Sequence, residues 1–346
     1  MLTVITCLVF YIGSALMIFP GMKKRKTKAE VLLAKNESNF VKGVAALMVF
    51  LAHSQDFLLQ NNFSGSAVLK PLSVLGGVGV LLFFFLSGYG IFKGYADKVP
   101  TIRYWRNRIV NVFIPAMVIS ACSRVAICLT CRENIEVLPF IRDVFYHQWY
   151  VDVVMLEYIV FFISWILAKN NKIKLLIYTL IGSCVIGLVF LHMGLNARWY
   201  NGVLLFPAGM TLAFGEDKIV SLCKRAKVIL LILSGIGFGL TGIGFSLLKG
   251  MFVGDLLKSL SGVYLALLLV MFVDVIQVGN KAVNWVGEKS LYVYLCHIYV
   301  LELISRIVQE RGTFGIKIEL WFYIILILSV LYAGVMSIVF KKRSKL

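Results

Sequence analysis

The chain has 346 residues, of which 60% are hydrophobic, and its mean hydropathy is +0.88. These values exclude an ordinary soluble domain and indicate a polytopic membrane protein. The net charge of +18 is typical of nucleic-acid-binding proteins, but 25 of the 35 Lys and Arg residues lie in alternate loops between apolar segments. The positive-inside rule explains this distribution, so we expect no nucleic-acid partner.

Apolar segments long enough to cross a bilayer recur along the whole chain. We predict an all-α polytopic fold with about eleven transmembrane helices, at residues 2–20, 41–59, 74–95, 109–129, 149–168, 174–192, 200–214, 227–247, 258–276, 290–308 and 319–340. The loop charges place the N-terminus outside and the C-terminus in the cytoplasm. We expect residues 1–38 to form a first transmembrane helix followed by a basic cytoplasmic linker, and not a signal peptide. Residues 39–346 form the main membrane domain.

The predicted helix 41–59 carries ionisable residues inside an apolar stretch. Lys42 and His53 are about three turns apart on one face, roughly 16 Å along the axis, which places His53 near the middle of the bilayer. An ionisable group at that depth indicates a functional site, and we predict a catalytic role for His53. Asp56, one turn further, either orients the imidazole and stabilises its charged form or is simply the first residue of the outer loop.

The next two stretches suggest close packing and anion binding. The glycines between Gly76 and Gly90, a run that includes Ser87, permit close approach of helices. The cytoplasmic loop 93–108 mixes aromatic residues with Arg103, Arg106 and Arg108. These arginines form either an ordinary basic belt at the membrane surface or a phosphate clamp, because guanidinium groups make paired hydrogen bonds to phosphate.

The helix predicted at 149–168 opens with Trp149, which is typical of an aromatic belt at the outer surface. Asp152 and Glu157 lie inside or near the apolar region and must therefore face protein, water or a cation.

The helix predicted at 290–308 has one polar stripe, formed by Ser290, Tyr294 and His297. His297 could be a helper acid, a substrate ligand or a helix–helix hydrogen-bond partner. Glu302 and Arg306, four residues apart, are expected to pair.

Several motifs of other enzyme classes are absent from the sequence. There is no Gly-x-Ser-x-Gly, His-Glu-x-x-His or phosphate-binding loop. Cys128 and Cys131 form a lone Cys-x-x-Cys, which is either a chance spacing or a local disulfide rather than a zinc site. We expect no bound metal or cofactor.

Four stretches in this order resemble the acyltransferase-3 family of bacterial multi-pass membrane acyltransferases. They are Lys42-x10-His53, the run from Leu82 to Tyr89, the basic stretch from Tyr104 to Pro115, and Ser290-x3-Tyr294-x2-His297. Trp149 with Tyr158 is similar to a weaker family pattern. The resemblance covers residues 40 to 340 and implies ten core helices, to which residues 2–20 add an eleventh. Two features depart from the family pattern: Asn111 replaces the second arginine of an Arg-x-x-Arg, and Val154 stands where one subclass has glutamate.

The resemblance implies that an acyl group, usually acetyl, passes from acyl-CoA to a hydroxyl of a cell-surface glycan at the bacterial cytoplasmic membrane. Lys42, Arg103, Arg106 and Arg108 would hold acetyl-CoA as co-substrate, and the sugar would enter past Asp56 and Trp149. His53 would be a general base or a covalent acyl carrier. Ser87, Glu157, Ser290, Tyr294 and His297 would bind substrate or support the structure. The expected partners are acyl-CoA, the glycan acceptor and membrane lipid, with the oligomeric state undetermined; a transporter or flippase of lipid-linked glycans is the alternative.

Overall fold

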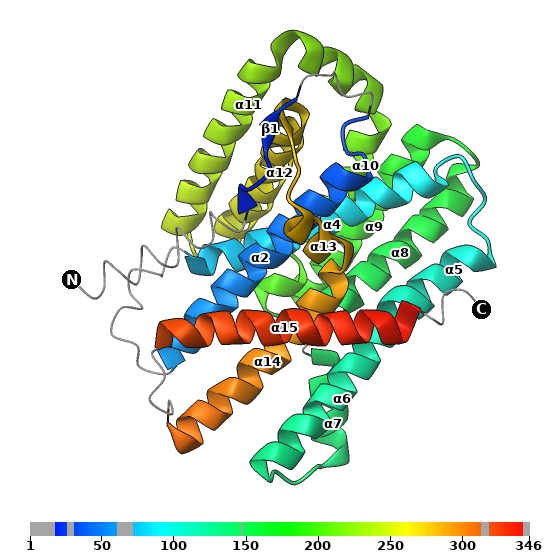
Figure 1. Ribbon diagram of the computed structural model, residues 1–346. Coiled ribbons are helices and arrows are strands. Elements are labelled where there is room, and N and C mark those ends of the chain that lie inside the picture. Colours follow the sequence, from blue (N-terminus) through cyan, green and yellow to red (C-terminus); the bar gives the residue numbers. More distant parts are fainter. Residues whose placement is uncertain (1–17, 26–30, 61–71, 147, 313–317, 342–346) are drawn as a thin grey trace.

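The computed structural model describes residues 18–25, 31–60, 72–146, 148–312 and 318–341, and it is almost entirely helical (Figure 1). Its α-helices are α2 (Lys35–Gln60), α4 (Leu72–Tyr95), α5 (Ile102–Arg108), α6 (Ile114–Cys131), α7 (Val137–Tyr146), α8 (Trp149–Ala168), α9 (Lys172–His192), α10 (Leu205–Phe214), α11 (Glu216–Leu247), α12 (Phe252–Val275), α13 (Lys281–Glu288), α14 (Ser290–Arg311) and α15 (Ile318–Lys341). A π-helical turn, η1 (Ile109–Phe113), joins α5 to α6, and a 3-10 turn, η2 (Ala197–Trp199), precedes α10.

Nine helical segments of the described residues are long and apolar enough to cross a membrane. They are α2, α4, the continuous run α5–η1–α6, α8, α9, the second part of α11, α12, α14 and α15, and they coincide with nine of the predicted spans. The prediction of an all-α polytopic membrane protein is therefore confirmed. The predicted first span, residues 2–20, lies almost wholly outside the described residues.

The predicted span 200–214 contains only a short helix, α10, of 10 residues. Leu205, Phe206 and Met210 on this helix are completely buried, so protein rather than lipid surrounds it. Glycines allow α10 to lie against α4: a Cβ atom added to Gly209 would meet the carbonyl oxygen of Phe85 at 1.9 Å. Non-helical backbone such as the turns before α10 is tolerated at membrane depth only where protein or a water-filled cavity covers it.

Helix α11 begins at Glu216, well before the predicted span at 227–247. Non-helical dihedral angles at Ala226 divide it, so the apolar span begins just after this kink. The buried carboxylate of Glu216 accepts hydrogen bonds from the backbone N–H of Leu32 (2.9 Å), the hydroxyl of Tyr89 (2.7 Å) and the ammonium of Lys93 (2.5 Å). One carboxylate thus joins the segment before α2, the end of α4 and the start of α11.

The linker before α2 is also fastened to the helical domain by a small sheet. Strand β1 (Lys23–Lys24) pairs antiparallel with β2 (Ile276–Gln277), Lys23 lying opposite Gln277. The guanidinium of Arg25 donates a hydrogen bond to the carbonyl of Val273 (3.0 Å) and pairs with Glu37 at the start of α2. The basic segment is therefore held at the end of the helical domain where α2 begins.

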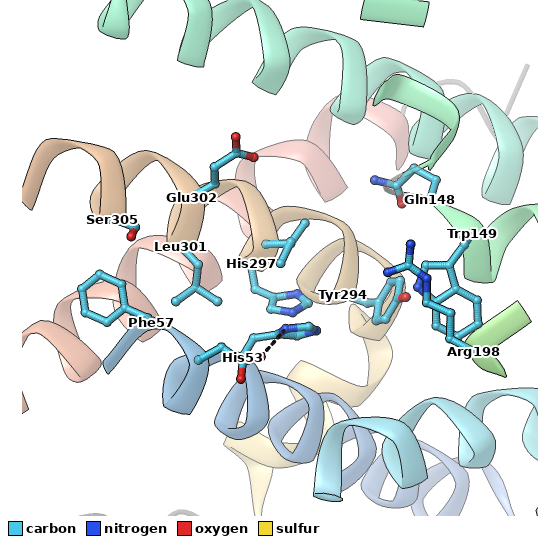
Figure 2. Close-up of a pocket in the computed structure, with 12 residues that line it drawn as sticks. His53, Phe57, Gln148, Trp149, Arg198, Tyr294, His297, Leu301, Glu302 and Ser305 are labelled. Carbon is cyan, nitrogen blue, oxygen red and sulfur yellow. Dashed lines mark ion pairs between the residues drawn. The ribbon is translucent and has the colours of Figure 1, made fainter. Parts of the chain in front are cut away.

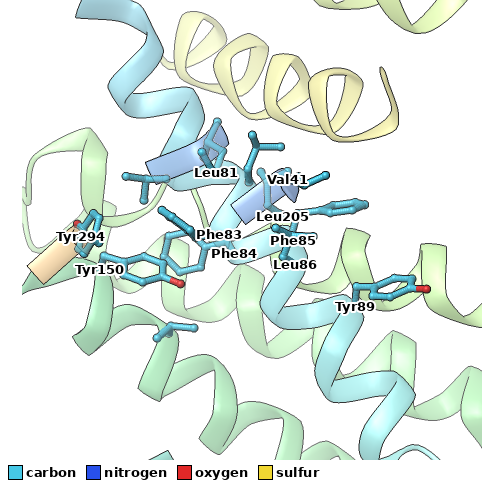
Figure 3. Packing of buried hydrophobic residues seen from close by; sticks show 14 of the residues in the cluster. Val41, Leu81, Phe83, Phe84, Phe85, Leu86, Tyr89, Tyr150, Leu205 and Tyr294 are labelled. Atoms are coloured by element: carbon cyan, nitrogen blue, oxygen red, sulfur yellow. The ribbon is translucent and has the colours of Figure 1, made fainter. Parts of the chain in front are cut away.

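Aromatic residues of α4 form the centre of the largest apolar cluster (Figure 3). Phe84 and Phe85 are at most 1% exposed, and the ring of Phe84 meets that of Tyr150 edge-to-face at 4.9 Å between centroids. Phe83 contacts both Tyr150 and Tyr294. Helices α4, α8 and α14 therefore meet at a ring cluster in the interior of the domain.

Candidate active site

Two cavities lie along helices α2 and α14, toward opposite ends of these helices. The first, here named the histidine pocket, has a volume of about 360 Å³ and is lined by His53, Asp56, Phe57, Gln148, Trp149, Arg198, Tyr294, His297, Ile298, Leu301, Glu302 and Ser305. The second, here named the arginine cavity, has a volume of about 290 Å³ and is lined by Lys42, Phe83, Leu86, Ser87, Gly90, Arg108, Val112, Tyr150, Val154, Tyr158, Ser290, Leu291 and Tyr294. Tyr294 lines both.

The predicted stripe on α14 runs from one cavity to the other. Ser290 lines the arginine cavity, Tyr294 lines both and His297 lines the histidine pocket. Helix α2 does the same, because Lys42 lines the arginine cavity and His53 the histidine pocket. On both helices, therefore, one end of the set of residues lies at the arginine cavity and the other end at the histidine pocket. Tyr294 lies where the two cavities meet.

His53 is the accessible imidazole of the histidine pocket. Its side chain is 41% exposed, and its Nδ1 lies 3.7 Å from Oδ2 of Asp56, the contact marked by the dashed line in Figure 2. This separation is too long for a hydrogen bond but short enough for the carboxylate to stabilise a protonated ring. Asp56 itself is 54% exposed, so it lies beside the imidazole and also at the surface.

His297 lies beside His53, with 5.3 Å between the ring centroids. It is only 2% exposed, and its Nδ1 lies 3.1 Å from the carbonyl oxygen of Val293. Because a carbonyl oxygen can only accept, Nδ1 carries a proton, and in the neutral ring Nε2 then has a free lone pair. Nε2 is buried and has no hydrogen-bond partner among the described residues.

The other end of the histidine pocket is polar and aromatic (Figure 2). Arg198, Trp149 and Gln148 gather there beside Tyr294. Trp149 also packs near Trp199, with 6.4 Å between the ring centroids. Gln148 and Arg198 were not predicted from the sequence. Gln148 directly precedes the predicted Trp149, but Arg198 lies in a turn with no periodic signal.

Three tyrosine rings surround the guanidinium of Arg108 at the arginine cavity. Its central carbon is 4.7 Å from the ring centroid of Tyr104, 5.0 Å from that of Tyr95 and 5.1 Å from that of Tyr158. Such cation–π contacts hold the planar group in place without neutralising its charge. Its Nε is buried and has no hydrogen-bond partner in the described part of the chain. Lys42 is the second cationic residue of the lining.

Some of the predicted site residues lie outside both linings. Arg103 and Arg106 are exposed on α5, five and two residues before Arg108. Glu157 is completely buried and faces α9, where its Oε2 accepts a hydrogen bond of 2.7 Å from the hydroxyl of Ser183. The structure therefore gives Glu157 a helix–helix contact, one of the two roles left open for it.

The structure also shows the outcome for the predicted ion pair on α14 and for the Cys-x-x-Cys spacing. Arg306 donates to Glu302 at 2.8 Å, which confirms the predicted pair, and Arg124 adds a second bond of 3.0 Å to the same carboxylate. Cys128 and Cys131 are both free thiols, so the local disulfide is not formed.

A family model for an acyltransferase domain, that of the acyltransferase-3 family, matches residues 35–339. The chain belongs to this family. The match covers nearly all of the helical domain and confirms the resemblance inferred from the four sequence motifs. Comparisons with curated proteins and with solved structures gave no match. The two cavities are thus those of a multi-pass membrane acyltransferase.

Proposed function

We propose that this acyltransferase moves an acetyl group from acetyl-CoA in the arginine cavity to a hydroxyl of a cell-surface glycan in the histidine pocket. The observation that supports this most is the meeting of two chemically different cavities at Tyr294. One contains cationic groups suited to the phosphates of CoA, and the other contains two imidazoles suited to proton transfer.

The donor is held by charge on one side of the domain. Arg108 and Lys42 attract the diphosphate of CoA, and the cavity of about 290 Å³ admits the acyl-pantetheine arm with this diphosphate rather than the whole molecule. The nucleotide end then remains near the exposed Arg103 and Arg106. Lys42 and His53 are roughly 16 Å apart along α2, a distance that an extended pantetheine arm can cross.

The reaction needs one base in the histidine pocket. Neutral His53 removes the proton from the acceptor hydroxyl, whose oxygen attacks the thioester carbonyl. A C–O bond forms, the C–S bond breaks, and the thiolate of CoA takes the proton from the imidazolium. Asp56, 3.7 Å from Nδ1, stabilises the imidazolium between these steps. The buried His297 packs against the ring of His53, and its Nε2 can accept a hydrogen bond from the acceptor molecule.

The acceptor side of the proposal rests on the lining of the histidine pocket. Trp149 offers an apolar ring face, and Asp56, Glu302 and Gln148 offer hydrogen-bonding oxygens. Sugars present both apolar C–H faces and hydroxyl groups, so this lining suits a glycan. Asp56 and Trp149 lie at the end of the domain that the loop charges place outside the cell.

The test is a comparison of wild type with His53→Ala in cells whose surface glycans are analysed by mass spectrometry. We expect wild type to add a 42 Da acetyl increment to the glycan, and the variant to lose transfer by about 10²–10⁴-fold while it still inserts into the membrane. Near-normal acylation by His53→Ala would remove His53 as the base. Glycan transport without any acyl increment in wild-type cells would favour the flippase alternative.

A further inference from the structure

Gln148 ends a chain of hydrogen bonds that begins in α7. The hydroxyl of Ser120 lies 2.9 Å from the carbonyl oxygen of Val144 and 2.5 Å from the hydroxyl of Tyr299. The amide Nε2 of Gln148 lies 3.0 Å from the same tyrosine hydroxyl. Three buried side chains from α6, α14 and the start of α8 are therefore linked.

The proton positions in this chain have one consistent arrangement. The carbonyl of Val144 can only accept, so Ser120 donates its single proton there. Tyr299 must then donate to Ser120, and its oxygen is left to accept from the Nε2 of Gln148. The side-chain amide cannot flip without breaking the chain, which fixes its carbonyl oxygen on the opposite side.

That oxygen, Oε1 of Gln148, has no hydrogen-bond partner among the described residues. The residue is 1% exposed and lines the histidine pocket, and Oε1 is hydrogen-bonded to none of the described residues. Nε2 of His297 is a second buried acceptor without a partner in the same lining. A buried acceptor is costly unless a donor reaches it, so these two atoms favour a ligand that brings hydrogen-bond donors.

The rest of the pocket offers both acceptors and donors. The carboxylates of Asp56 and Glu302 accept hydrogen bonds only, whereas the guanidinium of Arg198 in the same lining only donates them. Hydroxyl groups donate as well as accept, whereas phosphodiesters and esters only accept. A lining with several acceptors and a cationic donor therefore suits a ligand with several hydroxyl groups.

We infer that Gln148 is a substrate-binding residue whose Oε1 accepts a hydrogen bond from a hydroxyl of the acceptor other than the one that is acylated. The acceptor is accordingly a polyhydroxylated molecule, held at two points, rather than a simple alcohol. This inference rests on the proposed function, because it assigns Gln148 to the glycan and not to acyl-CoA.

The test uses purified full-length protein, labelled acetyl-CoA, and the host's surface glycan after removal of its ester groups with mild base. Gln148→Leu deletes the oxygen and should raise the KM for glycan about tenfold or more, with the KM for acetyl-CoA unchanged. Gln148→Glu keeps an acceptor oxygen but loses the Nε2 donor to Tyr299, so its KM for glycan should lie between those of wild type and Gln148→Leu. Tyr299→Phe releases the amide and should give an intermediate rise.

Ser164→Ala is the matched control, since Ser164 is a buried polar residue of α8 that lies in neither cavity lining. Thermal melting of each variant shows whether a change in KM comes from misfolding. If Gln148→Leu does not fold, the two single variants Gln148→Glu and Tyr299→Phe still test the role of Gln148. An unchanged glycan KM in Gln148→Leu, or equal rises for both substrates, overturns the role of Gln148. Absence of transfer to glycan by wild type contradicts the proposed function instead.

Discussion

The two imidazoles of the histidine pocket differ in their surroundings, and this difference separates their roles. His53 is 41% exposed beside a carboxylate, whereas His297 is 2% exposed with Nδ1 held by a backbone carbonyl. A base must meet the acceptor and exchange protons, so we assign that task to His53. His297 has a fixed tautomer and suits the binding of a hydroxyl.

Of the three arginines of the basic stretch, Arg108 lines the arginine cavity, whereas Arg103 and Arg106 do not. We predict that Arg108→Gln raises the KM for acetyl-CoA about tenfold and leaves the KM for glycan unchanged, because the cavity loses a fixed positive charge. Arg106→Gln is the matched control and should have a smaller effect, since Arg106 is exposed. Initial rates with each substrate varied in turn measure both. A larger effect from Arg106 would place the donor phosphates outside the cavity.

At the scale of helices, single buried polar contacts decide how neighbouring elements are joined. Glu157 joins α8 to α9 through Ser183, and Glu216 joins α4 and α11 to the segment before α2. Neither carboxylate lines either cavity. Substitutions at these positions should therefore change stability more than substrate binding.

We predict that Glu157→Gln retains at least half of the wild-type activity, because the amide oxygen can still accept the hydrogen bond from Ser183. Glu157→Ala leaves that hydroxyl unpaired inside the domain and should destabilise the protein by about 1–3 kcal/mol. Activity per inserted molecule and thermal melting in detergent distinguish the two effects. Strong loss of activity in a normally stable Glu157→Gln would show that the carboxylate acts on substrate after all.

Glu216 should give the protein a pH-dependent stability. Burial alone would raise the pKa of this carboxyl, but hydrogen bonds from Lys93, Tyr89 and Leu32 outweigh burial and hold the pKa below its ordinary value. The stabilisation is therefore present above the ordinary pKa of glutamate and disappears as the pH falls through the lower, folded-state value. We predict that Glu216→Gln melts a few degrees below wild type at pH 7, and that the difference shrinks steadily below about pH 4.5. A difference independent of pH would contradict this origin.

For the whole molecule, the arrangement of the two cavities makes the orientation in the membrane essential. Acyl-CoA is a cytoplasmic metabolite, so the arginine cavity must face the cytoplasm if the donor assignment holds. The predicted orientation meets this condition, because it places the connection after α4 inside and the connection after α6 outside.

We predict that, in a cysteine-free background, Asn134→Cys reacts with a membrane-impermeant maleimide in intact cells, whereas Lys98→Cys reacts only after lysis. Both positions are exposed and lie between helices that cross the membrane. Acyl transfer by each variant serves as the control for correct insertion. The reverse labelling pattern would falsify the orientation and separate Arg108 from its proposed donor.

The sequence by itself determined the fold class, nine of the long spans and the family. Each depends on local composition: a membrane span must be about 20 apolar residues, and the helical period places Lys42 with His53 and Ser290 with His297 on single faces. The Glu302–Arg306 pair follows from the same period.

Only the tertiary structure decided which of these residues share a cavity. Gln148, Arg198 and His53 come from segments far apart in the chain, and no periodic pattern links a turn residue such as Arg198 to a helix. The same holds for Arg108, whose three tyrosines come from separate helices. Helical periodicity fixes which face of a helix a residue occupies, whereas the packing of helices against one another fixes what that face meets.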